Sequence, residues 1–241
     1  MNDFHGFDAL SFDCYGTLID WETGMIEALA PLSSRSAEPL SRNAILEAHA
    51  QVESMQQRTT PAMPYRDLLA VVAKRLTERW GVCASWDECC AYGRSIGDWP
   101  EFADTAQALG YLKRYFKLVI LSNIDNASFA ASNRRLGVMF DAVYTAEDIG
   151  SYKPAEGNFT YMLDHLEATA VKRSEVLHVA ESLFHDHAPA NALGLASCWI
   201  HRRHAERGSG ATMPLTDAPK VDFRFTSLVG LVEAHVAEIS S

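Results

Sequence analysis

Short apolar runs recur along this chain between longer segments whose apolar residues have helical spacing. The first run, Phe7–Phe12, alternates apolar and polar residues, which is typical of a strand that enters a core. From the second run onward, a segment long enough for a helix separates each run from the next. This alternation predicts an α/β fold with a doubly wound, parallel, Rossmann-like sheet. The later strands are expected at Leu118–Ser122, Ala142–Thr145, Val176–Ala180 and Ser197–Ile200, with a weaker candidate at Phe223–Thr226.

Residues 21–99 break this alternation, because helical periodicity dominates there. Two segments, Asn43–Gln57 and Asp67–Trp80, carry apolar residues at the spacing of one helix face. A stretch of this length is too long for a connecting loop. We therefore predict a helical cap domain at 21–99, inserted into a Rossmann-like core domain that comprises residues 1–20 and 100–241.

The composition is that of an ordinary globular protein, with 48% hydrophobic and 22% charged residues. A formal net charge of −10 argues against a nucleic-acid partner but allows an anionic small-molecule substrate. No apolar run approaches the roughly 20 residues of a membrane span, and no secretory signal is visible. Five cysteines with no zinc-binding spacing are most simply reduced thiols, so we expect a cytoplasmic protein without a membrane partner.

The first strand candidate is followed by Asp13, Gly16 and Thr17. This order places a carboxylate at the carboxyl edge of the predicted sheet, where α/β proteins bind ligands. A carboxylate held there can act as a nucleophile and form a covalent ester. An Asp that only caps a turn is the simplest alternative, and three further sites along the chain weigh against it.

Two of these sites follow later in the chain. Ser122 and Asn123 end the second strand candidate, where a hydroxyl and an amide can donate hydrogen bonds to an anionic group of a substrate. Lys153 precedes Pro154, which predicts extended backbone at the lysine. A lysine in this place could keep a nearby carboxylate ionised.

The last site follows the strand candidate Val176–Ala180 and contains Glu181, Ser182 and Asp186. Carboxylates placed after a strand can anchor a lysine, orient a water molecule or bind Mg²⁺. Asp186 could also cap the helix that follows it, and the two roles are compatible. Histidines lie nearby, but we interpret them as loop and core residues and predict no metal site at His185, His187, His201 and His204.

Taken together and in this order, the four sites resemble the haloacid dehalogenase superfamily, and the similarity runs from Phe7 to Ser227 with the cap insertion included. Phosphatases of that superfamily carry a second Asp two positions after the nucleophile, which acts as a general acid. Here that position is Tyr15, whose phenol, with a pKa near ~10, does not readily transfer protons at neutral pH. Asp-x-Tyr, together with Ser197–Arg202, resembles the L-2-haloacid dehalogenase branch (type II).

The resemblance implies that Asp13 displaces halide from a short 2-haloalkanoic acid and that water then hydrolyses the aspartyl ester to a 2-hydroxy acid. Lys153 would keep Asp13 charged, and Asp186 would hold Lys153 in place. Thr17 would stabilise the carboxylate of Asp13. No cofactor is implied for this reaction. The candidate substrate-binding residues are Tyr15, Ser122, Asn123, Glu181, Ser182 and Arg66.

Three positions depart from the pattern of that branch. The cap stretch Ile45–His49 lacks the expected arginine, so Arg42 or Arg66 would have to replace it. Phe159 stands where a tyrosine is expected. Glu181 occupies the place of a metal-supporting Asp, which keeps a Mg²⁺-dependent phosphatase as the alternative function. A non-catalytic binding protein is a third possibility. Similar proteins commonly dimerise, so a homodimer is also possible.

Overall fold

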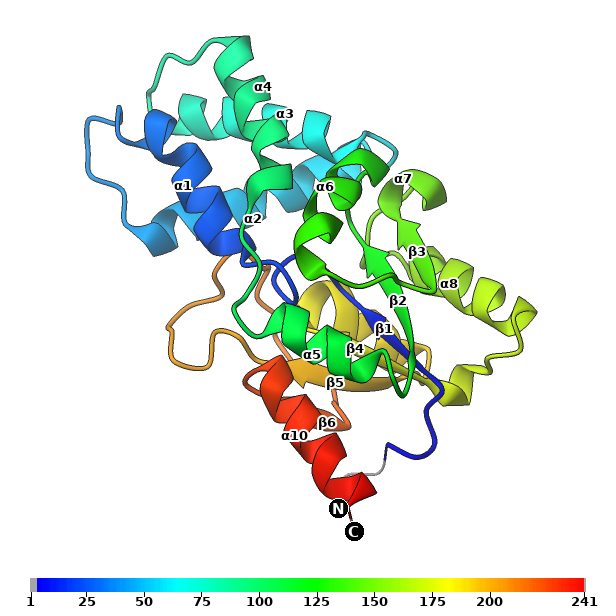
Figure 1. Ribbon diagram of the computed structural model, residues 1–241. Helices are drawn as coiled ribbons and strands as arrows, with labels where there is room; N and C mark the ends of the chain where they lie inside the picture. Colours follow the sequence, from blue (N-terminus) through cyan, green and yellow to red (C-terminus); the bar gives the residue numbers. More distant parts are fainter. Residues whose placement is uncertain (1–3, 241) are drawn as a thin grey trace.

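The computed structural model describes residues 4–240 and contains a six-stranded sheet with helices on both faces and a separate group of helices beyond one edge of the strands (Figure 1). All neighbouring strands pair in parallel, in the order β3-β2-β1-β4-β5-β6. This arrangement confirms the predicted doubly wound α/β fold. The strands are β1 (Ala9–Phe12), β2 (Lys117–Ser122), β3 (Ala142–Thr145), β4 (Val176–Ala180), β5 (Ala196–Ile200) and β6 (Phe223–Phe225).

Side chains of the central strands alternate between two apolar layers, as the pleat of a strand requires. In β1, Leu10 and Phe12 pack on the face covered by α5 (Thr105–Leu112), α6 (Asn126–Leu136) and α10 (Leu228–Ile239). The opposite face carries Ala9, with α8 (Glu156–Ala168) and α9 (Ala188–Ala192) packed against it. Because both faces are covered, β1 and β4 are buried along their whole length, and their polar residues Ser11 and His178 are hydrogen-bonded to each other.

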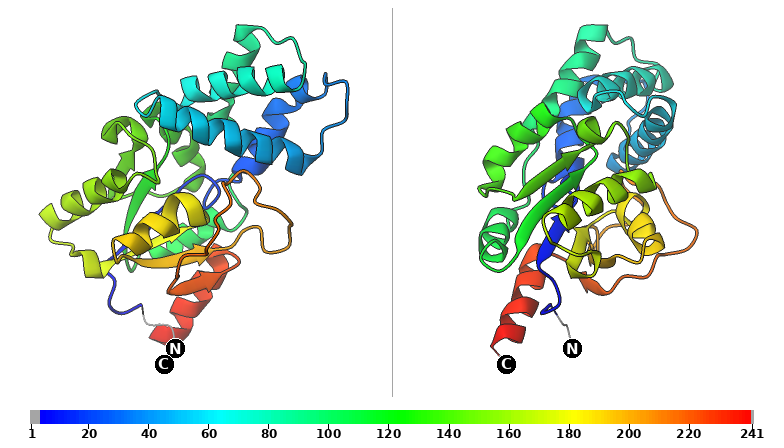
Figure 2. Two further views of the ribbon diagram at one scale, coloured as in Figure 1. Left: turned by 180° about the vertical axis from the view of Figure 1, so that it is seen from behind. Right: turned by 90° about the vertical axis from the view of Figure 1, so that its right-hand side faces the viewer.

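The predicted cap segment forms four helices that pack against one another, α2 against α3 and α3 against α4. Figure 2 shows this group above the sheet from behind and from the side. Hydrogen-bonding side chains fix several helix starts, since Asp20, Ser41 and Ser85 each accept a bond from a backbone N–H in the first turn. The helices are α1 (Trp21–Ser33), α2 (Arg42–Thr59), α3 (Tyr65–Arg79) and α4 (Trp86–Arg94).

The remaining elements are short and shape the loops at the ends of the strands. One of them, η3 (Leu183–His187), is a single turn of π-helix directly after β4, and it holds part of the fourth predicted site. The others are α7 (Ala146–Ile149) and the 3₁₀ turns η1 (Ser95–Asp98) and η2 (Arg173–Glu175). No helix within residues 4–240 has both the length and the apolar character needed to cross a membrane.

Strand order decides where a ligand can bind. From β1 the chain moves to β2 and β3 on one side, and later returns to β4 on the other side. At such a switch point the loops after the two central strands diverge and leave a crevice at their carboxyl ends. The loops after β1 and β4 therefore border this crevice, on the side of the sheet where the cap lies.

Candidate active site

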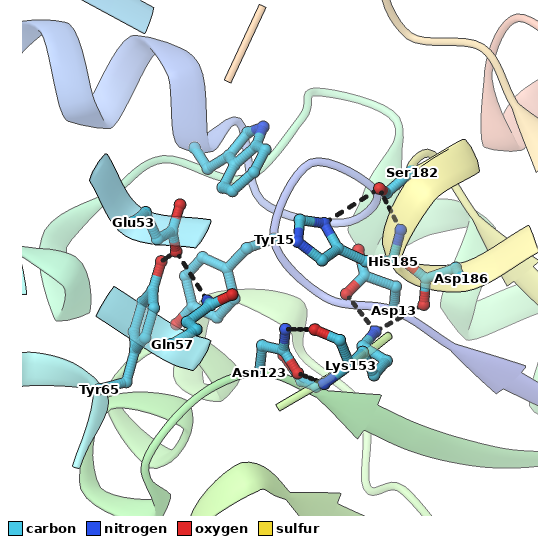
Figure 3. A pocket seen from close by; sticks show the side chains of 12 residues that line it. Asp13, Tyr15, Glu53, Gln57, Tyr65, Asn123, Lys153, Ser182, His185 and Asp186 are labelled. Atoms are coloured by element: carbon cyan, nitrogen blue, oxygen red, sulfur yellow. Dashed lines mark hydrogen bonds and ion pairs between the residues drawn. The ribbon is translucent and has the colours of Figure 1, made fainter. Parts of the chain in front are cut away.

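Three side chains that are far apart in the sequence meet at the switch point (Figure 3). Asp13 follows β1, Lys153 precedes α8, and Asp186 lies in η3. The Lys153 Nζ lies 3.0 Å from Asp13 Oδ1 and 2.6 Å from Asp186 Oδ1. All three side chains are buried. The structure thus assembles the predicted trio of two carboxylates and one ammonium.

The Lys153 ammonium has no N–H left for a substrate. Besides the two carboxylates, it donates to the Leu121 carbonyl oxygen at 2.8 Å, so its three donors have three acceptors. Burial alone would lower the pKa of Lys153, but the charges of Asp13 and Asp186 raise it above its ordinary value. Lys153 is therefore a fixed internal cation that orients the two carboxylates.

Asp13 is held at both of its oxygens. Thr17 Oγ1 donates to Asp13 Oδ2 at 2.8 Å and in turn accepts the backbone N–H of Glu181 at 2.9 Å. Burial raises the pKa of Asp13, and the neighbouring Lys153 opposes that rise. The hydrogen bonds leave one carboxylate orientation, as in-line attack on a carbon atom requires.

Asp186 serves the lysine rather than a helix end. Its Oδ1 also lies 3.0 Å from His178 Nε2, while the cap of the η3 turn is Ser182, whose hydroxyl accepts the His185 N–H at 3.0 Å. Burial opposes ionisation of Asp186, yet Lys153 and His178 lower its pKa well below the usual range. The helix after Asp186 is α9, whose N-cap position is His187 and which has no side-chain cap hydrogen bond, so Asp186 does not cap it.

Lys153 lies in a turn just before α8. The Lys153–Pro154 peptide is cis, and the Tyr152 carbonyl accepts the Ala155 N–H at 3.1 Å. The Asn123 amide braces this turn, since its Nδ2 donates to the Lys153 carbonyl at 2.9 Å and its Oδ1 accepts the Lys153 N–H at 2.6 Å. Asn123 thus holds the lysine loop on the end of β2.

Ser122 and Tyr15 both line this pocket, and their hydroxyl groups differ in whether they have a hydrogen-bond partner. The buried Ser122 Oγ has no hydrogen-bond partner within the described residues, so its hydrogen-bonding capacity is unused. The Tyr15 hydroxyl is instead paired with Ser132 Oγ at 2.6 Å, and the ring packs edge-on against Trp99. Burial raises the pKa of Tyr15 well above its ordinary value, so the phenol is a poor proton donor here.

The cap side of the pocket carries a polar group that the sequence did not single out. Glu53 and Gln57 of α2 and Tyr65 of α3 lie across the pocket from Asp13 and Lys153 (Figure 3). The Tyr65 hydroxyl donates to Glu53 Oε1 at 2.5 Å, and Gln57 Nε2 donates to the same oxygen at 3.2 Å. The sequence did carry a signal for this group, a row of polar residues four positions apart on one face of α2, which consists of His49, Glu53 and Gln57.

Two of the candidate substrate-binding residues do not line this pocket. Arg66 is half exposed, with its Nε 3.9 Å from Asp67. The Glu181 carboxylate lines a neighbouring cavity with Trp199 and Arg203. Burial, reinforced by the charge of Glu22, raises the pKa of Glu181 to about 8.

The other arginine considered at the sequence level, Arg42, is also directed elsewhere, with its guanidinium 3.8 Å from Glu22. His185, which the sequence did not suggest as a site residue, does line the active-site pocket. Its Nδ1 lies 3.1 Å from Ser182 Oγ, and burial lowers the pKa of its imidazole, so the ring is neutral at pH 7.

Residues 7–194 match the haloacid dehalogenase-like hydrolase family, which is more than half of the chain. The chain belongs to that family. Among curated proteins, no match was found. The membership agrees with the superfamily to which the sequence motifs pointed and makes Asp13 the first residue to consider as a nucleophile.

Solved structures share the whole architecture of this haloacid dehalogenase-like hydrolase, cap included. The L-2-haloacid dehalogenase PA0810 is 21% identical, with 95% of this chain and 99% of that chain covered and a TM-score of 0.74. The L-2-haloacid dehalogenase from Xanthobacter autotrophicus with chloropropionic acid covalently bound is 20% identical, with 95% and 98% covered and a TM-score of 0.75. The magnesium-bound HAD-hydrolase YfnB from Bacillus subtilis is 18% identical, with 95% and 98% covered and a TM-score of 0.73.

The magnesium-bound relative makes a metal test of this hydrolase necessary. Within the described residues, no three His, Cys, Asp or Glu side chains form a group that could hold an ion. Glu181, which stands at the metal-supporting position, faces the neighbouring cavity, and the Lys153 ammonium already lies between Asp13 and Asp186. The residues present do not fit a divalent ion held by these three carboxylates.

Proposed function

We propose that this hydrolase cleaves the carbon–halogen bond of short 2-haloalkanoic acids through an ester on Asp13. The observation that carries the proposal is Tyr15. It occupies the place of the general acid, but its ring is partly buried and its hydroxyl is bound to Ser132. An alkoxide leaving group needs a proton, whereas a halide leaves without one. The fold shared with L-2-haloacid dehalogenases supports the same choice.

In the first step, a carboxylate oxygen of Asp13 attacks the halogen-bearing carbon. The new carbon–oxygen bond forms as the carbon–halogen bond breaks, and the electron pair of that bond leaves with the halide. Lys153 and Thr17 hold the attacking group in one orientation. The free hydroxyl of Ser122 is the donor available to the substrate carboxylate.

In the second step, water attacks the Asp13 ester carbonyl. His185 lines the pocket as a neutral imidazole and can accept the proton of the attacking water. Collapse of the tetrahedral intermediate restores the Asp13 carboxylate, and the imidazolium returns its proton to the departing alkoxide. The products are a 2-hydroxy acid and one proton released to solvent, in addition to the halide of the first step.

Chloride release tests this function directly. Chloroacetate and 2-chloropropionate should each yield one equivalent of chloride per molecule consumed, and Asp13→Asn should abolish release. In ¹⁸O-labelled water under single-turnover conditions, the peptide that contains Asp13 should acquire one labelled oxygen. Phosphate-ester hydrolysis that EDTA removes, without chloride release from any haloacid, would contradict the proposal and favour the phosphatase alternative.

A further inference from the structure

The charges that line the active-site pocket are mostly negative. Asp13, Asp186 and Glu53 contribute carboxylates, and Lys153 contributes the single cation among the twelve lining residues. Lys153 already donates all its protons to Asp13, Asp186 and a carbonyl group. An anion that enters from the cap side therefore meets no free cationic donor among these residues.

Glu53 is fixed at this cap side by two hydrogen bonds, both to the same oxygen. Oε1 accepts from both Tyr65 and Gln57, whereas the contact of Oε2 is with His49 Nδ1 at 3.4 Å. A carboxylate has about four acceptor sites, so Glu53 retains capacity for further donors. Although burial opposes ionisation, the neighbouring His49 and the hydrogen bond from Tyr65 lower the pKa of Glu53.

No arginine that could bind a second anionic group of a substrate lies among the residues that line this pocket. Arg42 lies 3.8 Å from Glu22 and Arg66 lies 3.9 Å from Asp67, and neither contributes to the pocket. A negative group of the substrate placed near Glu53 would be repelled, and a positive one attracted, more strongly than in water, because the site is buried.

We propose that Glu53 is a specificity-determining residue that selects 2-haloacids carrying a protonated amine at the end remote from the carboxylate. The inference rests on the proposed dehalogenation. The ammonium would donate to Glu53 Oε2, while the halogen-bearing carbon lies at Asp13 and the carboxylate at Ser122. Glu53 takes no part in bond making or breaking.

Pairs of substrates with equal shape test the selection. An ω-ammonium group and an ω-methyl group are nearly isosteric, so each 2-bromo-ω-aminoalkanoate is compared with the 2-bromoalkanoate one carbon longer. Pairs built on four-, five- and six-carbon amino acids cover the range of lengths. We expect bromide release from the best ammonium compound to exceed that of its methyl partner by about 10- to 100-fold in kcat/KM, the range of a charge-assisted hydrogen bond.

Glu53→Gln keeps the shape and the hydrogen bonds of this position and removes its charge. The variant should lose the ammonium preference at least tenfold while bromide release from the methyl compounds is maintained or rises. Glu47→Gln, an exposed position on the same helix, is the matched control and should retain the preference. Thermal unfolding of both variants checks that the fold is intact.

Binding of products gives a readout that needs no turnover and no variant. The wild-type protein should bind the ω-amino-2-hydroxy acid at least tenfold more tightly than the 2-hydroxy acid one carbon longer, measured by calorimetry. Bromide release with equal efficiency from both members of every pair would overturn the inference and leave dehalogenation standing. An equal loss on both members in Glu53→Gln would also overturn it. Absence of bromide release from every compound would overturn the proposed function. In that case, equal affinities for the ω-amino-2-hydroxy acid and for the 2-hydroxy acid one carbon longer would separately overturn the selection by Glu53.

Discussion

The core half and the cap half of the active-site pocket are built differently. On the core side, every proton of the Lys153 ammonium has an acceptor, and Asp13 is bound at both oxygens. On the cap side, Glu53 is anchored through one oxygen and keeps capacity at the other. The core half is a closed network around Asp13, the proposed nucleophile, and the cap half offers an acceptor that still has capacity for a hydrogen bond.

The two proposals therefore assign reactivity and selection to separate parts of the fold. The core residues follow strands whose positions are fixed by parallel pairing. Their side chains form a network of buried charges, and a substitution of one member disturbs the others. The cap residues lie on helices, where one side chain can be exchanged without moving a strand. Variants of the core half should therefore affect both stability and chemistry, whereas variants of the cap half should affect the choice of substrate.

Removal of the lysine gives the largest effect that we expect from this contrast. Lys153→Met leaves Asp13 and Asp186 buried beside each other without their cation. Loss of one partner from a buried ion pair costs about 3–5 kcal/mol in the free energy of unfolding, and halide release should fall roughly a thousandfold. Urea unfolding and chloride release measure the two effects.

Lys113→Met is the control for this variant, because Lys113 forms a partly exposed pair with Asp141. That pair should contribute about 0–1 kcal/mol. Equal destabilisation by the two variants would show that the buried ion network contributes no more to the free energy of unfolding than the partly exposed pair does.

Substitution of His185 should have a smaller effect, confined to the second step. His185→Gln removes the neutral base that accepts the proton of water, so the Asp13 ester should accumulate. A rapid burst of one chloride per protein should precede turnover that is about 100-fold slower, and mass spectrometry should detect the ester. His165→Gln, an exposed change on α8, should show no burst. A burst that slows as much as turnover does would assign His185 to the first step instead.

The smallest effect concerns Glu181, which belongs to neither half of the pocket. Its pKa is raised from 4.5 to about 8, so the folded state favours the protonated form. The contribution to stability is complete below pH 4.5 and is lost as the pH rises to about 8. Glu181→Gln should therefore melt a few degrees higher than the wild type at pH 8.5 and differ little from it at pH 4. Glu167→Gln, an exposed change, should show no such pH dependence, and a constant difference for Glu181→Gln at both pH values would refute the explanation.

Local sequence was enough to predict the sheet and the core half of the site. Each apolar run formed a strand within two residues of the expected limits, and the weak candidate near Phe223 proved to be a sixth parallel strand. Because parallel strands present their carboxyl ends at one edge, the residues after them had to meet there. Asp13, Ser122, Lys153 and Asp186 did so, which is why their order along the chain was informative. The domain limits and the oligomeric state stay predictions.

The tertiary structure alone decided which side chains complete the pocket. Glu181 also follows a strand, yet its carboxylate lies in the neighbouring cavity, because the direction of a side chain in a loop depends on packing around it. Arg66 was expected to face the substrate, but the orientation of α3 turns it to solvent and brings Tyr65 inward. Helical spacing states which residues share a face of a helix, but the packing of one helix on another determines what that face meets. For that reason the sequence could place the carboxylates and the lysine of the core half, and only the fold could reveal the acidic group opposite them.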